Sequence, residues 1–248
     1  MRKSDLGLSL TAAAVAFALG FLGCGTVNEP TPSHELCPQA PSDLSQADFE
    51  SYEAVATYLE ANGVVMVNEV SWPHRVQFAY ELRKFPAPLL QYLARRDVKI
   101  RIMNGRGVGE DPTYPAFEKT GKDERRWRGV PGSGGDPTRI VANRLYEGHG
   151  CTSLVLHEHA HTLDFVGVPG REGPISKDPE WLAIMAEDPA YQDFAKKPCG
   201  DYCGDPVEAF AETFALYHAC SQSRAIVQKS ARVTRFLESL TTAVQKGF

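Results

Sequence analysis

The stretch Leu154-Val-Leu-His-Glu-His-Ala-His-Thr-Leu-Asp164 contains His157, Glu158 and His161 in the spacing His-Glu-x-x-His. On an α-helix, two histidines four residues apart lie about 40° apart on one face. Both imidazoles can then bind one Zn²⁺ at about 2.0–2.1 Å, and Glu158 lies where it can take a proton from a bound water. The apolar residues before His157 indicate that the helix is packed in the interior. The stretch therefore predicts a buried helix over 153–165 with a zinc site, rather than a solvated helix with incidental histidines.

Two other polar residues of this stretch are assigned less specific roles. His159 lies about 200° around the helix from His157 and is predicted to be a packing or surface residue. Asp164 follows His161 by one turn and is predicted either to hold a ligand imidazole or to cap the helix. The sequence leaves both roles of Asp164 open.

A catalytic zinc usually has three protein ligands and one water, so the third ligand decides the class of enzyme. The metzincin pattern requires a histidine six residues after His161, but that position is Gly167. The thermolysin-like pattern requires a glutamate with an acidic residue four positions on. Glu180 and Glu187 lie in the right range, but Ile184 and Tyr191 occupy those positions. Both patterns are excluded.

A better third ligand lies in the stretch Pro206-Val-Glu-Ala-Phe-Ala-Glu-Thr-Phe-Ala-Leu-Tyr217. Glu208 and Glu212 are four residues apart and share one face of an amphipathic helix. One of them can bind zinc while the other braces a zinc-bound histidine. The alternative is a surface helix with two solvated glutamates, which the surrounding alanines and phenylalanines disfavour.

The two motifs together resemble those of a known family. His157-Glu158-x-x-His161, followed 47 residues later by Glu208-Ala-Phe-Ala-Glu212-Thr-Phe, is similar to the catalytic domain of anthrax lethal factor and the secreted Pro-Pro endopeptidases. The resemblance implies His157, His161 and Glu208 as zinc ligands, Glu158 as general base and Glu212 as a residue behind the ligands. It implies a zinc metallopeptidase with one Zn²⁺ per chain and a peptide or protein as substrate.

The resemblance also implies two features of the substrate cleft. The family has a tyrosine a few residues before the ligand glutamate that stabilises the oxyanion, and we assign this role to Tyr202, although its spacing departs by one residue. The glycine-rich stretch 128–135 is similar to the family's approach to an edge strand. The strand Thr138-Arg-Ile-Val141 is predicted to be that edge, with Thr138, Ile140 and Val141 as the residues that bind an extended peptide by strand addition.

The rest of the chain predicts an α+β fold in one compact zincin-like domain over residues 42–248, with a small sheet followed by a helical C-terminal half. Strands are expected at 64–67, 98–102 and 138–141, and a loop over 104–136. Helices are expected at 43–60, 74–84, 87–95, 153–165, 178–186, 206–219 and 224–245.

The N-terminal residues are typical of export. A basic start, an apolar run and Gly23-Cys24 predict a signal peptide over 1–23, with Cys24 as the lipid attachment site of a bacterial lipoprotein and plain secretion as the alternative. Residues 24–41 are predicted to form a flexible tether. Export permits disulfides; Cys199 and Cys203 are the easiest pair to close, although the sequence does not determine the connectivity.

Composition excludes some classes of function. The 248 residues have a net charge of −5 and a pI near 5.8, which argues against a nucleic-acid partner. We expect a monomer that meets a membrane only through the lipid. Two alternatives to a metallopeptidase stay open: a non-catalytic zinc-stabilised surface or binding protein, and a zinc hydrolase of non-protein amides. The first does not need Glu158, which the chain nevertheless has.

Overall fold

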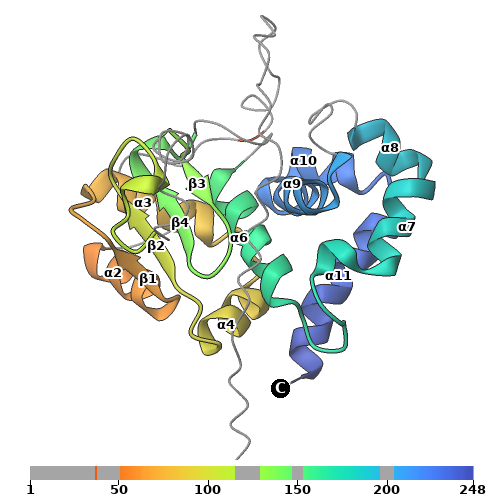
Figure 1. Cartoon of the computed structure of the whole chain (residues 1–248), viewed down its shortest axis with the longest axis horizontal. Coiled ribbons are helices and arrows are strands. Elements are labelled where there is room, and N and C mark those ends of the chain that lie inside the picture. Colours follow the sequence, from red (N-terminus) through yellow and green to blue (C-terminus); the bar gives the residue numbers. More distant parts are fainter. Residues whose placement is uncertain (1–36, 38–50, 115–128, 147–152, 196–203, 248) are drawn as a thin grey trace, which may run out of the picture. The chain divides into compact units, whose positions relative to one another are not determined.

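The computed structural model describes residues 37, 51–114, 129–146, 153–195 and 204–247, all within one compact unit that spans residues 31–248. The helices are α2 (Tyr52–Ala61), α3 (Trp72–Leu82), α4 (Ala87–Arg95), α6 (Leu154–Val166), α7 (Pro179–Glu187), α8 (Pro189–Ala195), α9 (Pro206–Ala219), α10 (Ser221–Val227) and α11 (Ala231–Lys246). The strands are β1 (Val64–Met66), β2 (Ile100–Met103), β3 (Gly132–Ser133) and β4 (Thr138–Val141). The predicted α+β fold, with a small sheet and a helical second half, is confirmed (Figure 1).

The sheet has the order β1-β2-β4-β3. β2 pairs with β1 and β4 in parallel, whereas β3 pairs with β4 in antiparallel fashion, with Gly132 opposite Ile140 and Ser133 opposite Arg139. The prediction that Thr138–Val141 is the edge strand is therefore wrong. The stretch predicted to be loop folds back beside β4, so the edge is β3, and Thr138, Ile140 and Val141 lie in a buried inner strand.

Helix α6 lies between the sheet and α9 (Figure 1). Its apolar residues from Leu154 to Leu163 are at most 3% exposed. Apolar side chains on nearly all sides of a helix are expected where sheet and helices enclose it. The His-Glu-x-x-His segment therefore stands in the middle of the core, on a rigid element.

The first turn of α6 is fixed by a buried polar contact. Ser153 caps the helix by accepting a hydrogen bond from the Leu156 amide, and its hydroxyl donates to Glu81 of α3 at 2.8 Å. The other oxygen of Glu81 accepts a hydrogen bond from Lys84 at 2.8 Å. Glu81 is 2% exposed, so loss of either donor would leave a buried carboxyl oxygen without its partner. The start of the metal-binding helix is thereby tied to α3.

We expect Ser153→Ala to lower the free energy of unfolding by about 2–4 kcal/mol, because it removes an N-cap and leaves a buried carboxylate short of one donor. Urea denaturation measures the loss. Ser51→Ala is the matched control: Ser51 caps α2 by accepting from the Ala54 amide, but the site is exposed, and we expect a cost of about 1 kcal/mol. Equal losses in the two variants would contradict the role of Glu81.

The other face of the sheet carries two arginines that share one carboxylate as their ion-pair partner. Arg101 and Arg139 are register partners on β2 and β4, where like charges destabilise a sheet. Asp111, which is fully buried, lies 2.7 Å from Nε of Arg101 and 3.1 Å from Nε of Arg139. Burial by itself raises the pKa of Asp111, but hydrogen bonds from Arg101 and Thr113 lower it to about 2. The ion pair fastens the loop after β2 to the sheet.

This pKa predicts how stability depends on pH. Because the pKa of Asp111 is about 2 in the folded chain, below the 3.8 of the free side chain, its stabilisation is complete above about pH 4 and is lost as the pH falls toward 2. We expect Asp111→Asn to be less stable than the wild type at neutral pH, with a gap that narrows over this range. Chemical denaturation at a series of pH values measures the gap, and a gap that stays constant would contradict the assignment.

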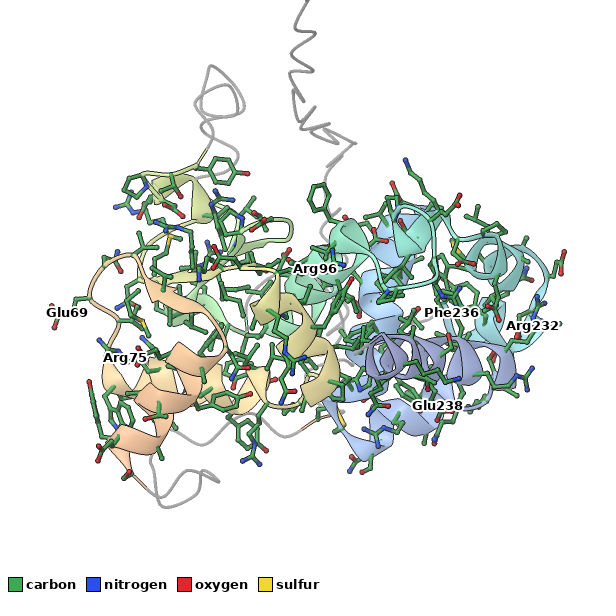
Figure 2. All side chains as sticks on the ribbon, turned by 90° about the horizontal axis from the view of Figure 1, so that it is seen from below. Glu69, Arg75, Arg96, Arg232, Phe236 and Glu238 are labelled. Carbon is green, nitrogen blue, oxygen red and sulfur yellow. A yellow bond between two sulfur atoms is a disulfide. The ribbon has the colours of Figure 1, made fainter. Side chains whose placement is uncertain are left out.

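The helical half departs from the prediction at two places. The helix expected over 224–245 is divided into α10 and α11, because Ser230 caps α11 through the Val233 amide and donates to Asp188 at 2.7 Å. The helix α8 was not predicted. Trp181 of α7 joins α8 and α11. Its ring centroid lies 5.6 Å from that of Tyr191 of α8 and 5.4 Å from that of Phe236 of α11, which is labelled in Figure 2.

A disulfide joins Cys37 to Cys220, at the junction of α9 and α10. The sequence did not determine this pairing, since 183 residues separate the two cysteines. Cys24, Cys199 and Cys203 lie outside the described residues, so the predicted lipid site and the predicted Cys199–Cys203 pair are not described. Among the helices that are described, none combines the length and the apolar character needed to cross a membrane.

Candidate metal centre and active site

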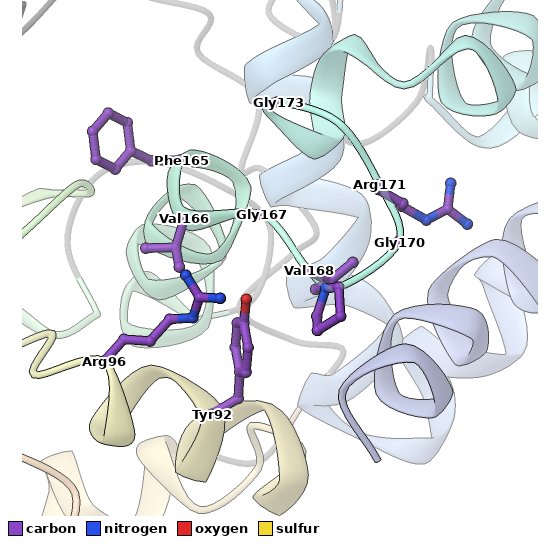
Figure 3. Close-up of a pocket in the computed structure, with 10 residues that line it drawn as sticks. Tyr92, Arg96, Phe165, Val166, Gly167, Val168, Gly170, Arg171 and Gly173 are labelled. Carbon is purple, nitrogen blue, oxygen red and sulfur yellow. The ribbon is translucent and has the colours of Figure 1, made fainter. Parts of the chain in front are cut away.

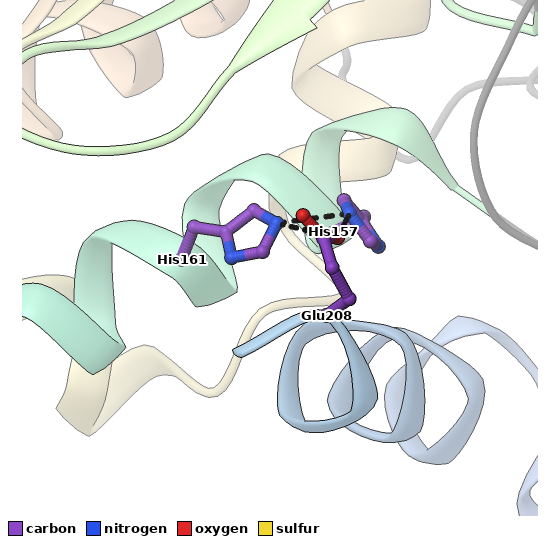
Figure 4. Close-up of side chains that lie close together, drawn as sticks. All are labelled: His157, His161 and Glu208. Carbon is purple, nitrogen blue, oxygen red and sulfur yellow. Dashed lines mark hydrogen bonds and ion pairs between the residues drawn. The ribbon is translucent and has the colours of Figure 1, made fainter. Parts of the chain in front are cut away.

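Three predicted ligands converge at the contact between α6 and α9. Nε2 of His157 lies 3.0 Å from Nε2 of His161, and Oε2 of Glu208 lies 3.3 and 3.2 Å from these two nitrogens (Figure 4). Four-coordinate zinc with bonds of about 2.0–2.1 Å spaces neighbouring ligand atoms about 3.3 Å apart. The triangle thus has the dimensions of three corners of a zinc tetrahedron.

The hydrogen bonds around the triangle indicate that its atoms present lone pairs. Nδ1 of His157 donates to Oε2 of Glu212 at 3.1 Å, which leaves Nε2 of a neutral His157 as an acceptor. Oε2 of Glu208 is buried and receives no well-directed hydrogen bond from the described residues. Acceptors that face one another at this distance repel unless a cation or proton lies between them. The donor set therefore fits a divalent metal with affinity for imidazole and carboxylate, such as Zn²⁺.

The electrostatics indicate the same need for positive charge. Burial by itself lowers the pKa of His157, but the carboxylates of Glu208 and Glu212 outweigh it and raise the pKa well above the usual value. Burial by itself raises the pKa of Glu208, but the imidazoles of His157 and His161 outweigh it and lower the pKa well below the usual range. The side chains of His161 and Glu208 are 14% and 23% exposed, so the centre opens to solvent on their side.

Glu158 lies beside this centre under the edge strand. It is 4% exposed, and burial raises its pKa, although a hydrogen bond from the Gly134 amide and the two nearby imidazoles work against the rise. A methyl group on Gly132 would lie 2.6 Å from Cγ of Glu158, and one on Gly134 would lie 2.1 Å from Cβ of His161. Only residues without side chains let β3 and its continuation approach α6 this closely.

Threonine hydroxyls hold the glycine-rich segment on α6. Oγ1 of Thr162 donates to the Gly135 carbonyl at 2.8 Å, and the Gly135 amide lies 3.1 Å from the same oxygen. Thr138 of β4 lies 2.5 Å from Thr162 and 3.0 Å from Nδ1 of His159. Sequence reasoning missed this contact; the signal available was the run Gly132-Ser-Gly-Gly135, which marks a close backbone approach.

The structure places the other predicted residues as follows. Glu212 contacts His157, as the resemblance implied. His159 is 2% exposed and packs against Phe85, so it is a packing residue as predicted.

Asp164 neither caps α6 nor holds a ligand imidazole. Both of its oxygens accept from Ser176, from the amide at 2.5 Å and the hydroxyl at 2.8 Å, because the loop after α6 folds back over it. Tyr202 lies outside the described residues.

A hollow of about 290 Å³ lies at the C-terminal end of α6 (Figure 3). Phe165 and Val166 line it from α6, and Tyr92 of α4 lines it together with Arg96, the residue that follows α4. The guanidinium of Arg96 lies 4.6 Å from the centre of the Tyr92 ring. The loop 167–173 forms the remaining wall. Its glycines at 167, 170 and 173 have φ values of 71°, 81° and 74°, which residues with a side chain rarely adopt.

Comparison with known families supports the interpretation of the helices α6 and α9 as the two motif helices of one family. The family described as "Anthrax toxin lethal factor, N- and C-terminal domain" matches residues 57–240, which include both motif helices. The chain belongs to this family. A Pro-Pro endopeptidase of Clostridioides difficile (strain 630) is 29% identical over 167 residues, 58% of this chain and 69% of that protein. The Pro-Pro endopeptidase PPEP-2 of Paenibacillus alvei has a similar fold, with a TM-score of 0.54 and 21% identity over 75% of this chain and 97% of that chain.

Proposed function

We propose that this member of the lethal factor family is a zinc-dependent metalloendopeptidase. The observation that carries the proposal is the triangle of Nε2 of His157, Nε2 of His161 and Oε2 of Glu208, with atoms 3.0–3.3 Å apart. Peptidase activity is supported by its membership of the family and by the Pro-Pro endopeptidase named above. In this proposal the three side chains hold one Zn²⁺ and Glu212 fixes the ring of His157.

The roles of the residues follow from their positions. A bound Zn²⁺ lowers the pKa of water and polarises the scissile carbonyl. Glu158 accepts the proton of the attacking water and delivers it to the leaving amine; its burial raises its pKa and so makes it a better proton acceptor. In this proposal β3, the edge strand of the described sheet, binds the substrate backbone by strand addition. Tyr202, outside the described residues, is proposed as the donor to the oxyanion.

The test measures zinc content and peptide cleavage together on the chain from Gly25 onward. A proteome-derived peptide library that includes Pro-Pro bonds is incubated with the purified protein. The protein is used as isolated, after chelation, and after zinc is restored. We expect one zinc per chain, and cleavage that chelation abolishes and zinc restores.

Other outcomes decide between the alternatives. One bound zinc without cleavage of any peptide would favour a zinc-stabilised binding protein or a hydrolase of non-protein amides. A folded chain that binds no zinc would refute the proposed site. No described contact favours either alternative over peptide hydrolysis.

We further propose that residues 1–23 direct export and that Cys24 carries the lipid of a cell-envelope lipoprotein. The Cys37–Cys220 disulfide supports export, because such bonds persist in oxidising compartments. Membrane fractionation of cells that express the full chain or Cys24→Ser tests the proposal. We expect only the full chain in the membrane fraction, and equal partition of both would refute lipidation.

A further inference from the structure

One exposed aromatic side chain stands on the metal-binding face of α6. Phe165 is 63% exposed, whereas nearly every other residue of this helix is buried or half-buried. At 100° per residue, Phe165 lies about 80° around the axis from His157, between His161 at about 40° and Glu158 at about 100°. It lies about 6 Å along the axis from His161. A large apolar side chain is thus presented to solvent beside the reacting centre.

The direction of the edge strand relates Phe165 to the substrate. Gly132 lies beside Glu158, Gly134 lies beside His161, and the Gly135 carbonyl accepts a hydrogen bond from Thr162. β3 and its continuation therefore run along α6 in the same N-to-C direction. A peptide that adds to β3 in the commoner antiparallel mode runs the opposite way, so its residues before the scissile bond lie toward the C-terminal end of α6. Phe165 and the hollow shown in Figure 3 lie on that side.

We propose that Phe165 is a specificity-determining residue that contacts an apolar substrate side chain on the N-terminal side of the scissile bond. This inference deepens the proposed peptidase function and rests on it. An apolar partner, such as a proline, an aliphatic or an aromatic residue, removes the exposed ring of Phe165 from water, whereas a charged partner loses hydration against it. The preference is therefore for apolar over charged residues at one or two positions before the cleaved bond.

The experiment compares kcat/KM for the wild type, Phe165→Ala, Phe165→Leu and Leu182→Ala. The substrate is a peptide that the wild type cleaves in the library, varied one position at a time from apolar to charged. Leu182 of α7 is 41% exposed and serves as the control for loss of an exposed apolar side chain. Zinc content and Tm are measured on each variant, to verify that the folded site is retained.

We expect Phe165→Ala to lower kcat/KM about tenfold for the best peptide, to reduce the discrimination against charge only at positions before the scissile bond, and to be rescued largely by Phe165→Leu. We expect Leu182→Ala to leave the substrate preference at every position unchanged. If zinc-loaded Phe165→Ala keeps the wild-type preference at every substrate position, or if its preference changes only at positions after the scissile bond, the inference is wrong. The peptidase function is not affected by either result. Absence of cleavage by the wild type overturns the peptidase function and, with it, the inference.

Discussion

We expect peptide cleavage by Glu158→Gln to fall by about 10²–10⁴-fold and one zinc per chain to be retained, because the amide keeps the size of the side chain but does not accept the proton of the attacking water in the proposed mechanism. Glu158 does not belong to the ligand triangle, so metal affinity does not depend on it directly. The measurement is kcat/KM on a peptide that the wild type cleaves, together with zinc content of the same preparation.

The control for Glu158→Gln is His159→Phe, which changes the adjacent residue on the side of the helix away from His157. His159 packs against Phe85 and its Nε2 has no hydrogen-bond partner among the described residues. Burial lowers the pKa of His159 to about 3, so the ring is neutral at physiological pH. We expect this variant to lose some stability, because the contact between Nδ1 of His159 and the Thr138 hydroxyl is removed, but to retain most of its activity. A Glu158→Gln variant that holds zinc and cleaves at the wild-type rate would remove Glu158 from the mechanism.

The second large effect is expected from a single methyl group at the edge strand. In Gly134→Ala the new Cβ would lie 2.1 Å from Cβ of His161 and 2.8 Å from the Glu158 carbonyl oxygen, so the segment after β3 must lift away from α6. We expect kcat/KM to fall by at least about 100-fold, because both the substrate edge and the hydrogen bond from the Gly134 amide to Glu158 are displaced. Overpacking also destabilises the fold by about 1–3 kcal/mol.

Gly204→Ala is the matched control for Gly134→Ala, since a Cβ at Gly204 meets no atom within 4 Å and its backbone requires no left-handed conformation. Both variants are compared with the wild type in kcat/KM and in urea denaturation. We expect Gly204→Ala to change neither quantity appreciably. Normal activity in Gly134→Ala would show that the approach of this segment to α6 is not required.

The sequence by itself determined which residues of the candidate centre share a helix face. His157, Glu158 and His161 were predicted on one helix because a spacing of four residues places two side chains on one face. Glu208 and Glu212 were predicted on a second helix by the same reasoning, and both helices are present with the expected bounds to within one residue. Such arguments depend only on the helical repeat, which is a local property of the chain.

The tertiary structure decided everything that depends on contacts between distant segments. Thr138–Val141 was predicted correctly as a strand, but only the pairing with Gly132–Ser133 shows that it is not the edge. Asp164 was predicted either to hold a ligand imidazole or to cap α6, whereas the return of the loop after α6 pairs it with Ser176. The Cys37–Cys220 bond, the Ser153–Glu81 contact and the proximity of Gly134 to His161 likewise join residues far apart in sequence. No helical or strand repeat encodes them, because they arise from how the elements pack.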